Sequence, residues 1–218
     1  IGYLKELNIP IQVNTTVSRY NLHDLEKIAE KVKEMQAVLW SLFFLVPTGR
    51  GMEKDMITPD EHEAVMKWLY QIQQQMPYGV KATEAPHYRR VVLQEKHKAG
   101  QHNTTSEQKR ADVLGRAPKG VNDGDGFVFI SHIGEVYPSG FLPLTCGNVR
   151  KDSLAHIYRH SPIMNHLRDK SLLKGKCGVC EFNTVCGGSR ARAFAITGDY
   201  LESDPYCAYM PGVGREVC

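Results

Sequence analysis

The chain has 218 residues, a net charge of +3, 42% apolar residues and 23% charged residues. This composition is typical of one large or two small globular domains and excludes a disordered or fibrous protein. Basic and acidic residues are intermixed, so no basic patch points to nucleic acid, and no apolar run reaches the ~20 residues of a membrane-spanning helix. We therefore expect neither a nucleic acid nor a membrane as partner.

The start of the chain and its cysteines bear on its cellular setting. The sequence begins at Ile1 with neither an initiator Met nor an export leader, and we interpret it as a piece of a longer protein. Secreted disulfide scaffolds spread cysteines over a short chain, whereas a late cluster of them more often binds metal inside the cell. All six lie in the last third of this chain: Cys146, Cys177, Cys180, Cys186, Cys207 and Cys218.

The first hundred residues alternate strand and helix signals. Runs of β-branched and apolar residues predict strands, and apolar residues at helical spacing predict helices. The predicted elements are a strand at 9–17, a helix that begins with a capping box of Asn21 and Asp24, a buried strand at 37–46, a helix capped by Thr58 and ended by Pro77, and a strand at 79–85. The order β-α-β-α-β predicts a parallel α/β sheet or part of a barrel.

The remaining residues differ in composition. Residues 98–125 are polar and Gly-rich, which predicts a linker or mobile loop, or alternatively a loop that covers a substrate. A hairpin is predicted at 127–137, and a short helix is predicted from Asp152 to Tyr158. From Lys174 onward the chain has many Gly and Cys and little apolar periodicity, so we expect that burial alone does not organise it.

Four cysteines have the spacing of a metal centre: Cys177-x2-Cys180-x5-Cys186, and then Cys207 after twenty further residues. Two thiolates separated by two residues can hold one centre from a tight turn, and two more complete a set of four sulfur ligands. Zinc and a [4Fe–4S] cluster both accept four thiolates. A close triplet with one distant cysteine favours the cluster over zinc, and either of them over disulfides. Coordination would also supply folding energy to this segment.

These residues resemble the C-terminal auxiliary-cluster domain, called SPASM or twitch, of radical S-adenosylmethionine (SAM) enzymes. The resemblance rests on residues 177–193 (CGVCEFNTVCGGSRARA) and 204–207 (DPYC), preceded by the 134–138 hairpin and by 147–149. Residues 14–17 (NTTV) and 40–51, which end in PTGRG, are similar to the last strands of the SAM barrel. Within the family, CGG-x-RARA and residues 137–143 (YPSGFLP) are most similar to members that act on tetrapyrroles.

The resemblance implies an α/β fold with two domains: the C-terminal part of a partial (β/α)6 radical SAM barrel at 1–97 and a small α+β SPASM/twitch-like Fe–S domain at 126–218. A linker or mobile loop at 98–125 would join them. It also implies two sets of binding residues. An auxiliary [4Fe–4S] cluster would bind to Cys177, Cys180, Cys186 and Cys207, and SAM would lie near Asn14, Thr16, Val46 and Pro47. Asn14 and Thr16 could instead satisfy each other in the barrel interior. No catalytic residue is assigned.

The chain also departs from the family pattern. The Cys-x3-Cys-x2-Cys motif, whose [4Fe–4S] cluster binds and reduces SAM, is absent, so we expect it upstream in the intact protein and expect no activity from the chain alone. Ser139 stands where a Cys is usual, and Ser189 and Arg190 occupy a stretch where another is expected. We therefore expect one auxiliary cluster. Cys146 is interpreted as a small buried residue, and Cys218 is assigned no role.

Four polar residues each have a functional and a structural interpretation. Glu84 and His87 could move protons at a substrate or form structural hydrogen bonds. Arg190 and Arg192 could pair with substrate propionates or offset the charge of the cluster, but the interpretation we favour is a solvated helix face.

The sequence thus predicts the C-terminal part of a radical SAM oxidoreductase of tetrapyrrole (heme or heme d1) biosynthesis. Its electron donor would be a protein such as ferredoxin or flavodoxin, and the oxygen sensitivity of the clusters implies a reducing cytoplasm. One alternative is a radical SAM maturase that modifies a peptide substrate rather than a small molecule. Another is a non-catalytic zinc or Fe–S binding module.

Overall fold

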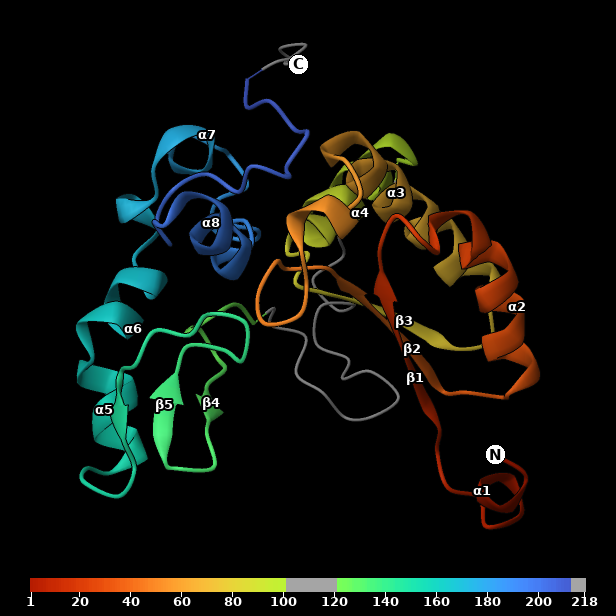
Figure 1. Ribbon diagram of the computed structural model, residues 1–218. Helices are drawn as coiled ribbons and strands as arrows, with labels where there is room; N and C mark the ends of the chain where they lie inside the picture. Colours follow the sequence, from red (N-terminus) through yellow and green to blue (C-terminus); the bar gives the residue numbers. More distant parts are fainter. Residues whose placement is uncertain (101–120, 213–218) are drawn as a thin grey trace.

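The computed structural model describes residues 1–100 and 121–212, here called the N-terminal part and the C-terminal part (Figure 1). Each part has its own three-stranded sheet. Most of the predicted linker at 98–125 lies outside the described residues. Within the described residues, no helix is long and apolar enough to cross a membrane.

The N-terminal part is a parallel α/β unit. Its strands run in the order β1-β2-β3, and both pairs are parallel. This confirms the predicted fold class, although the strands are shorter than the apolar runs that predicted them. The elements are α1 (Gly2–Glu6), β1 (Gln12–Val17), a 3-10 turn (Leu22–Asp24), α2 (Leu25–Glu34), β2 (Leu39–Phe44), a 3-10 turn (Glu53–Asp55), α3 (Pro59–Gln75), β3 (Gly79–Thr83) and α4 (His87–Lys98).

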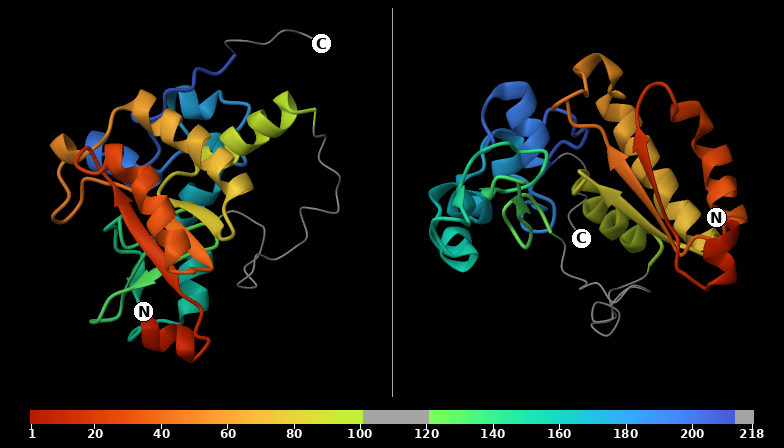
Figure 2. Two further views of the ribbon diagram at one scale, coloured as in Figure 1. Left: turned by 90° about the vertical axis from the view of Figure 1, so that its right-hand side faces the viewer. Right: turned by 60° about the horizontal axis from the view of Figure 1, so that its bottom comes forward.

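The two faces of this sheet differ in polarity because successive side chains of a strand point to opposite faces. On one face Val17, Trp40 and Leu42 are buried against apolar residues of α2 and α3. On the other face Asn14 aligns with Ser41 in the register of β1 and β2. In the right-hand view of Figure 2, α2 and α3 lie on one side of the sheet and the C-terminal part lies on the other.

Of the two helix starts predicted in the N-terminal part, the structure confirms one and contradicts the other. Thr58 and Glu61 form a reciprocal capping box with Pro59 at the first turn of α3, as predicted. The capping box of Asn21 is wrong: its side chain accepts from the backbone N–H of Ser18 and donates to the carbonyl of Thr16. Asn21 therefore closes the turn after β1, and a 3-10 turn comes before α2.

The C-terminal part is a small α+β unit with an antiparallel sheet in the order β4-β5-β6. Its elements are β4 (Phe129–Ile130), β5 (Glu135–Tyr137), β6 (Gly147–Asn148), α5 (Leu154–His160), α6 (Pro162–Arg168), a 3-10 turn (Lys170–Leu172), α7 (Gly175–Gly178) and α8 (Arg190–Thr197). The predicted hairpin is β4–β5. The predicted cap of α5 is displaced by one residue, because Ser153 rather than Asp152 accepts from the N–H of His156.

Helix α8 shows that burial contributes to the organisation of the cysteine-rich segment. Its residues Ala191 and Phe194 pack in an apolar cluster with Leu142 and Leu167 of the C-terminal part. Val46, which follows β2 of the N-terminal part, is buried in the same cluster. The carboxyl end of β2 is therefore anchored in the core of the C-terminal part.

Candidate metal centre

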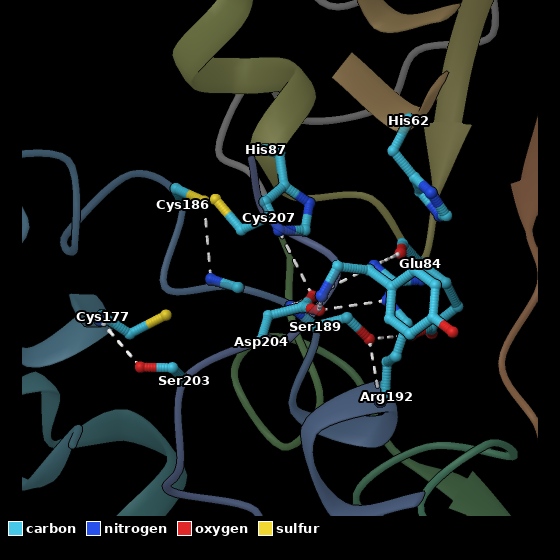
Figure 3. A network of polar contacts seen from close by, with 12 residues as sticks. His62, Glu84, His87, Cys177, Cys186, Ser189, Arg192, Ser203, Asp204 and Cys207 are labelled. Atoms are coloured by element: carbon cyan, nitrogen blue, oxygen red, sulfur yellow. Dashed lines mark hydrogen bonds and ion pairs between the residues drawn. The ribbon is translucent and has the colours of Figure 1, made fainter. Parts of the chain in front are cut away.

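The four cysteines of the predicted centre surround one pocket. Cys177 lies in α7, Cys180 and Cys186 in the loop that follows, and Cys207 in the chain after α8. All four are free thiols lining the same pocket, whose empty space is about 330 Å3 with the solvent at its mouth included. Figure 3 shows Cys177, Cys186 and Cys207 around one space beside His87. Within the described ranges, no group of three or more His, Cys, Asp or Glu side chains is placed to hold a single metal ion.

Two glycines shape the loop that carries Cys186. Gly187 and Gly188 both adopt positive φ, at 66° and 67°, a region that glycine enters without strain. The N–H of Gly188 donates to Cys186 Sγ at 3.4 Å, and a Cβ at Gly188 would lie 3.2 Å from Cys177 Sγ. Asn122 holds the same turn, donating to the carbonyls of Cys186 at 3.3 Å and Gly188 at 3.1 Å. The CGG sequence therefore brings backbone close to two sulfurs.

The thiols of the pocket are not equivalent. Burial raises the pKa of Cys186 to about 12 and also raises the pKa of Cys180. Burial acts in the same direction on Cys207, but the neighbouring His87 outweighs it and lowers the pKa of that thiol. Since metals bind thiolates, a metal centre here would displace protons from the buried sulfurs.

The structure overturns the favoured interpretation of Arg190 and Arg192 as a solvated helix face. Both side chains are buried, with exposed fractions of 1% and 0%. Arg190 donates to the carbonyls of Tyr200 at 3.0 Å and Glu202 at 2.7 Å, and its Nη2 lies 3.7 Å from Cys177 Sγ. Arg190 is therefore placed to offset negative charge on the sulfurs, and it is too buried to meet a propionate.

Arg192 belongs to a buried charge network centred on Asp204. Its Nε and Nη2 donate to the two carboxylate oxygens at 3.1 and 3.0 Å, and His87 Nε2 lies 3.2 Å from Asp204 Oδ2. Burial opposes ionisation of Asp204, but the charges of Arg192 and His87 hold its pKa well below the usual range. Figure 3 shows this network next to Cys186 and Cys207.

The same network joins the two parts of the molecule at the carboxyl ends of the parallel strands. Arg192 donates to the carbonyls of Leu45, just after β2, and Glu84, just after β3, at 3.4 and 2.9 Å. Ser189 donates its hydroxyl to the Glu84 carboxyl at 3.0 Å. Burial and the charge of Asp123 raise the pKa of Glu84 to about 8, and Glu84 has a positive φ of 55°. For Glu84 these contacts match structural hydrogen bonding, whereas His87 meets the network through its contact with Asp204 at 3.2 Å.

The residues expected near SAM lie at two places. Asn14 and Thr16 are exposed on the face of β1 that points away from α2 and α3, and Gln12 donates to Asn14 Oδ1 at 2.7 Å. Val46 and Pro47 begin the loop after β2. The carbonyl of Val46 accepts from the N–H of Thr48 at 2.8 Å, while its side chain is buried against the C-terminal part.

Cys146 and Cys218 are the two cysteines outside the predicted centre. Cys146 is partly buried, packs beside Val136 and Ile157, and lies outside the pocket, as expected of a small apolar residue. Cys218 lies outside the described residues.

Sequence reasoning missed Asp204, Asn122 and Arg90 at this site; Arg90, from α4, also lines the cysteine pocket. Asp204 stands within the DPYC motif, and its place three residues before Cys207 was the available signal. Asn122 and Arg90 come from sequence far before the motif. No local pattern distinguishes them from ordinary polar residues.

The chain is similar to known proteins over nearly its whole length. It is 43% identical over 212 residues to the AdoMet-dependent heme synthase of Methanosarcina barkeri, covering 97% of this chain and 60% of that protein. It is 41% identical over 213 residues to the AdoMet-dependent heme synthase of Nitratidesulfovibrio vulgaris, covering 97% of this chain and 57% of that protein. The PqqA peptide cyclase of Bradyrhizobium diazoefficiens is 26% identical over 230 residues, covering 96% and 52%. The chain thus spans between half and three fifths of the length of these relatives. No family model matches it.

Solved structures share the fold. Streptococcus suis SuiB bound to S-adenosylmethionine superposes with a TM-score of 0.58 at 13% identity, covering 95% of this chain and 47% of that one. anSMEcpe with bound AdoMet and a peptide superposes with a TM-score of 0.56 at 16% identity, covering 94% and 55%. The predicted resemblance to radical SAM enzymes is confirmed: the AdoMet-dependent heme synthases are among the relatives of the chain, and its fold is shared with the AdoMet-bound structures of SuiB and anSMEcpe.

Proposed function

We propose that this chain is the C-terminal part of a radical SAM oxidoreductase of tetrapyrrole biosynthesis, and that Cys177, Cys180, Cys186 and Cys207 hold an auxiliary [4Fe–4S] cluster in it. The observation that carries the proposal is the arrangement of these four free thiols around one pocket. The relative named AdoMet-dependent heme synthase, 43% identical, supports the choice of substrate class. We retain the division into a barrel part at 1–97, a linker at 98–125 and an auxiliary domain at 126–218.

The residues around the pocket fit a cluster with four thiolate ligands. The protein supplies one sulfur for each iron, a backbone N–H from Gly188 to Cys186 Sγ at 3.4 Å, and the guanidinium of Arg190 beside Cys177. Hydrogen bonds to sulfur and nearby positive charge stabilise the negative charge of such a centre. When bound, the cluster would supply one-electron chemistry. Since all four ligands are protein thiolates, electron transfer is favoured over direct binding of substrate.

The SAM site would lie on the N-terminal part. Asn14 and Thr16 stand on the polar face of the sheet, where the methionyl or ribose groups would be held, and Val46 and Pro47 would border the adenine. Because this chain lacks the Cys-x3-Cys-x2-Cys motif, we place the SAM-cleaving [4Fe–4S] cluster in the rest of the intact protein. A ferredoxin or flavodoxin would supply electrons in a reducing cytoplasm, where free thiols and such clusters persist.

The cluster is tested by anaerobic reconstitution of the chain with iron and sulfide, followed by measurement of iron, zinc and acid-labile sulfide. We expect about four iron and four sulfide per chain, the content of a [4Fe–4S] cluster. Cys207→Ser should lose most of both, and Cys146→Ser is the matched control that should retain them. One tightly bound zinc per chain without sulfide would overturn the proposal in favour of a zinc-binding module.

The substrate class needs a second measurement. An iron porphyrin that carries propionates can be titrated into the intact protein and followed by its Soret absorption. We expect a saturable shift that a peptide does not compete away. Binding of a peptide instead of the porphyrin would favour the maturase alternative, to which the similarity with the peptide cyclase points.

A further inference from the structure

Helix α4 of the N-terminal part packs against the cysteine loop through its first turn. His87 and Arg90 line the cysteine pocket, and Arg89 donates to the carbonyl of Val185, one residue before Cys186, at 3.1 Å. Arg90 is only 2% exposed, and its guanidinium stacks on the ring of Tyr209, 4.6 Å from the centroid. A cation from the barrel side of the molecule is thus fixed in the wall of the cysteine pocket.

The hydrogen bonds of Arg90 leave two of its N–H groups unused, one on Nη2 and the one on Nε. Its Nη1 donates to Glu63 Oε1 at 3.1 Å and to Gln94 Oε1 at 2.6 Å, and its Nη2 donates to Glu63 Oε2. The guanidinium has five N–H groups. Its Nε is buried and has no hydrogen-bond partner among the residues that the structure describes. A buried donor on a charged group without an acceptor is costly, which points to an acceptor that the protein itself does not provide.

After Glu63, the sulfurs of the pocket are the negative groups that act on this cation. Burial opposes the charge of Arg90, but Glu63 and then the charges of Cys207 and Cys186 raise its pKa, and the charge of Arg90 acts to lower the pKa of both thiols. Glu63 and Gln94 occupy both N–H groups of Nη1 and Glu63 one of Nη2, so the free donors of Arg90, a residue that lines the pocket, are the Nε–H and the second N–H of Nη2.

We propose that Arg90 donates its Nε–H to a sulfur of the auxiliary cluster and thereby makes the cluster easier to reduce. The inference rests on the proposed function and assigns to a barrel helix a part in tuning the auxiliary centre. Reduction adds negative charge, and a fixed cation with an N–H directed at sulfur stabilises the reduced form more than the oxidised form. Water cannot screen the effect because the guanidinium is buried.

The test compares the midpoint potentials of the reconstituted chain and of variants at Arg90. The chain is poised with redox mediators, and the reduced cluster is followed by electron paramagnetic resonance. For Arg90→Gln we expect at least a tenfold lower ratio of reduced to oxidised cluster at a fixed potential, about 59 mV for one electron. Arg90→Lys keeps the charge but loses the Nε–H, so its midpoint potential should fall most of the way to that of Arg90→Gln.

Arg168→Gln is the matched control, because Arg168 also stacks on a tyrosine, Tyr158, at 4.6 Å but does not line the pocket. Its potential should equal that of the unmodified chain. Iron and sulfide content establishes that each variant holds its cluster. An unchanged potential in a loaded Arg90→Gln variant, or a wild-type potential in Arg90→Lys, would overturn the inference while the proposed function stands. An unmodified chain that assembles no cluster would overturn both.

Discussion

Asp204 is the buried carboxylate at the centre of the charge network between the two parts. It accepts from Arg192 at 3.1 and 3.0 Å and from the backbone N–H groups of Ser189 at 2.9 Å and Tyr206 at 3.0 Å, and His87 lies 3.2 Å away. Asp204→Asn leaves one acceptor oxygen and places an amide donor against other donors. Removing one partner of a buried ion pair costs about 3–5 kcal/mol. We expect the free energy of unfolding to fall by that amount.

Equilibrium unfolding in urea at pH 7, followed by circular dichroism under reducing conditions, measures this loss. Because the pKa of Asp204 is depressed in the folded state, its stabilisation is present at pH 7 and is lost only in acid, as the pH falls below the ordinary carboxyl pKa of about 4. Asp24→Asn is the control: Asp24 pairs with Lys27 at 2.8 Å on the surface, and its loss should change little. A loss below about 1 kcal/mol for Asp204→Asn would refute the argument from buried charge.

Two further predictions concern the loop and the interface. Gly188→Ala should abolish most iron binding, measured after reconstitution, because its Cβ would lie 2.5 Å from Arg190 Nη2 and 3.2 Å from Cys177 Sγ. Gly198→Ala, with a positive φ of 78° but nothing within 4 Å of the new Cβ, should cost only about 1–2 kcal/mol and keep the iron. Because the raised pKa of Glu84, about 8, means that the folded state holds the proton, stability should fall as the pH rises from about 5 to about 8. Urea unfolding at several pH values should show that the free energy of unfolding of Glu84→Gln depends less on pH than that of the unmodified chain. An equally steep dependence would contradict the raised pKa of Glu84.

Much of the N-terminal part was predictable because its signals are local. The start of α3 at Thr58 depends on a cap, a proline and an acid within four residues, and all of these are visible in the sequence. The helix start at Asn21 failed for a local reason as well, since an Asn side chain can serve a turn or a helix equally well. Only the backbone path after β1 decides between the two, and that path depends on the sheet.

In the candidate site, too, the features with local signals were predictable and those with distant partners were not. That the four cysteines lie around one pocket was predictable, because their close spacing is visible directly in the chain. The burial of Arg190 and Arg192 was not, because their partners lie on other turns and on the other part of the molecule. Arg192 meets the carbonyls of Leu45 and Glu84, more than 100 residues earlier. Without those partners in view, two arginines on a helix are expected to face solvent.

The position of α4 limits how freely the auxiliary domain could be exchanged between enzymes. A chimera joined within residues 98–125 would take α4 from one parent and the cysteine loop from the other. His87 and Arg90 would then face a carboxylate and sulfurs that had not evolved with them, and any mismatch would strand a buried charge. A graft that is to fold and load iron should therefore carry the first turn of α4 together with the cysteine motif.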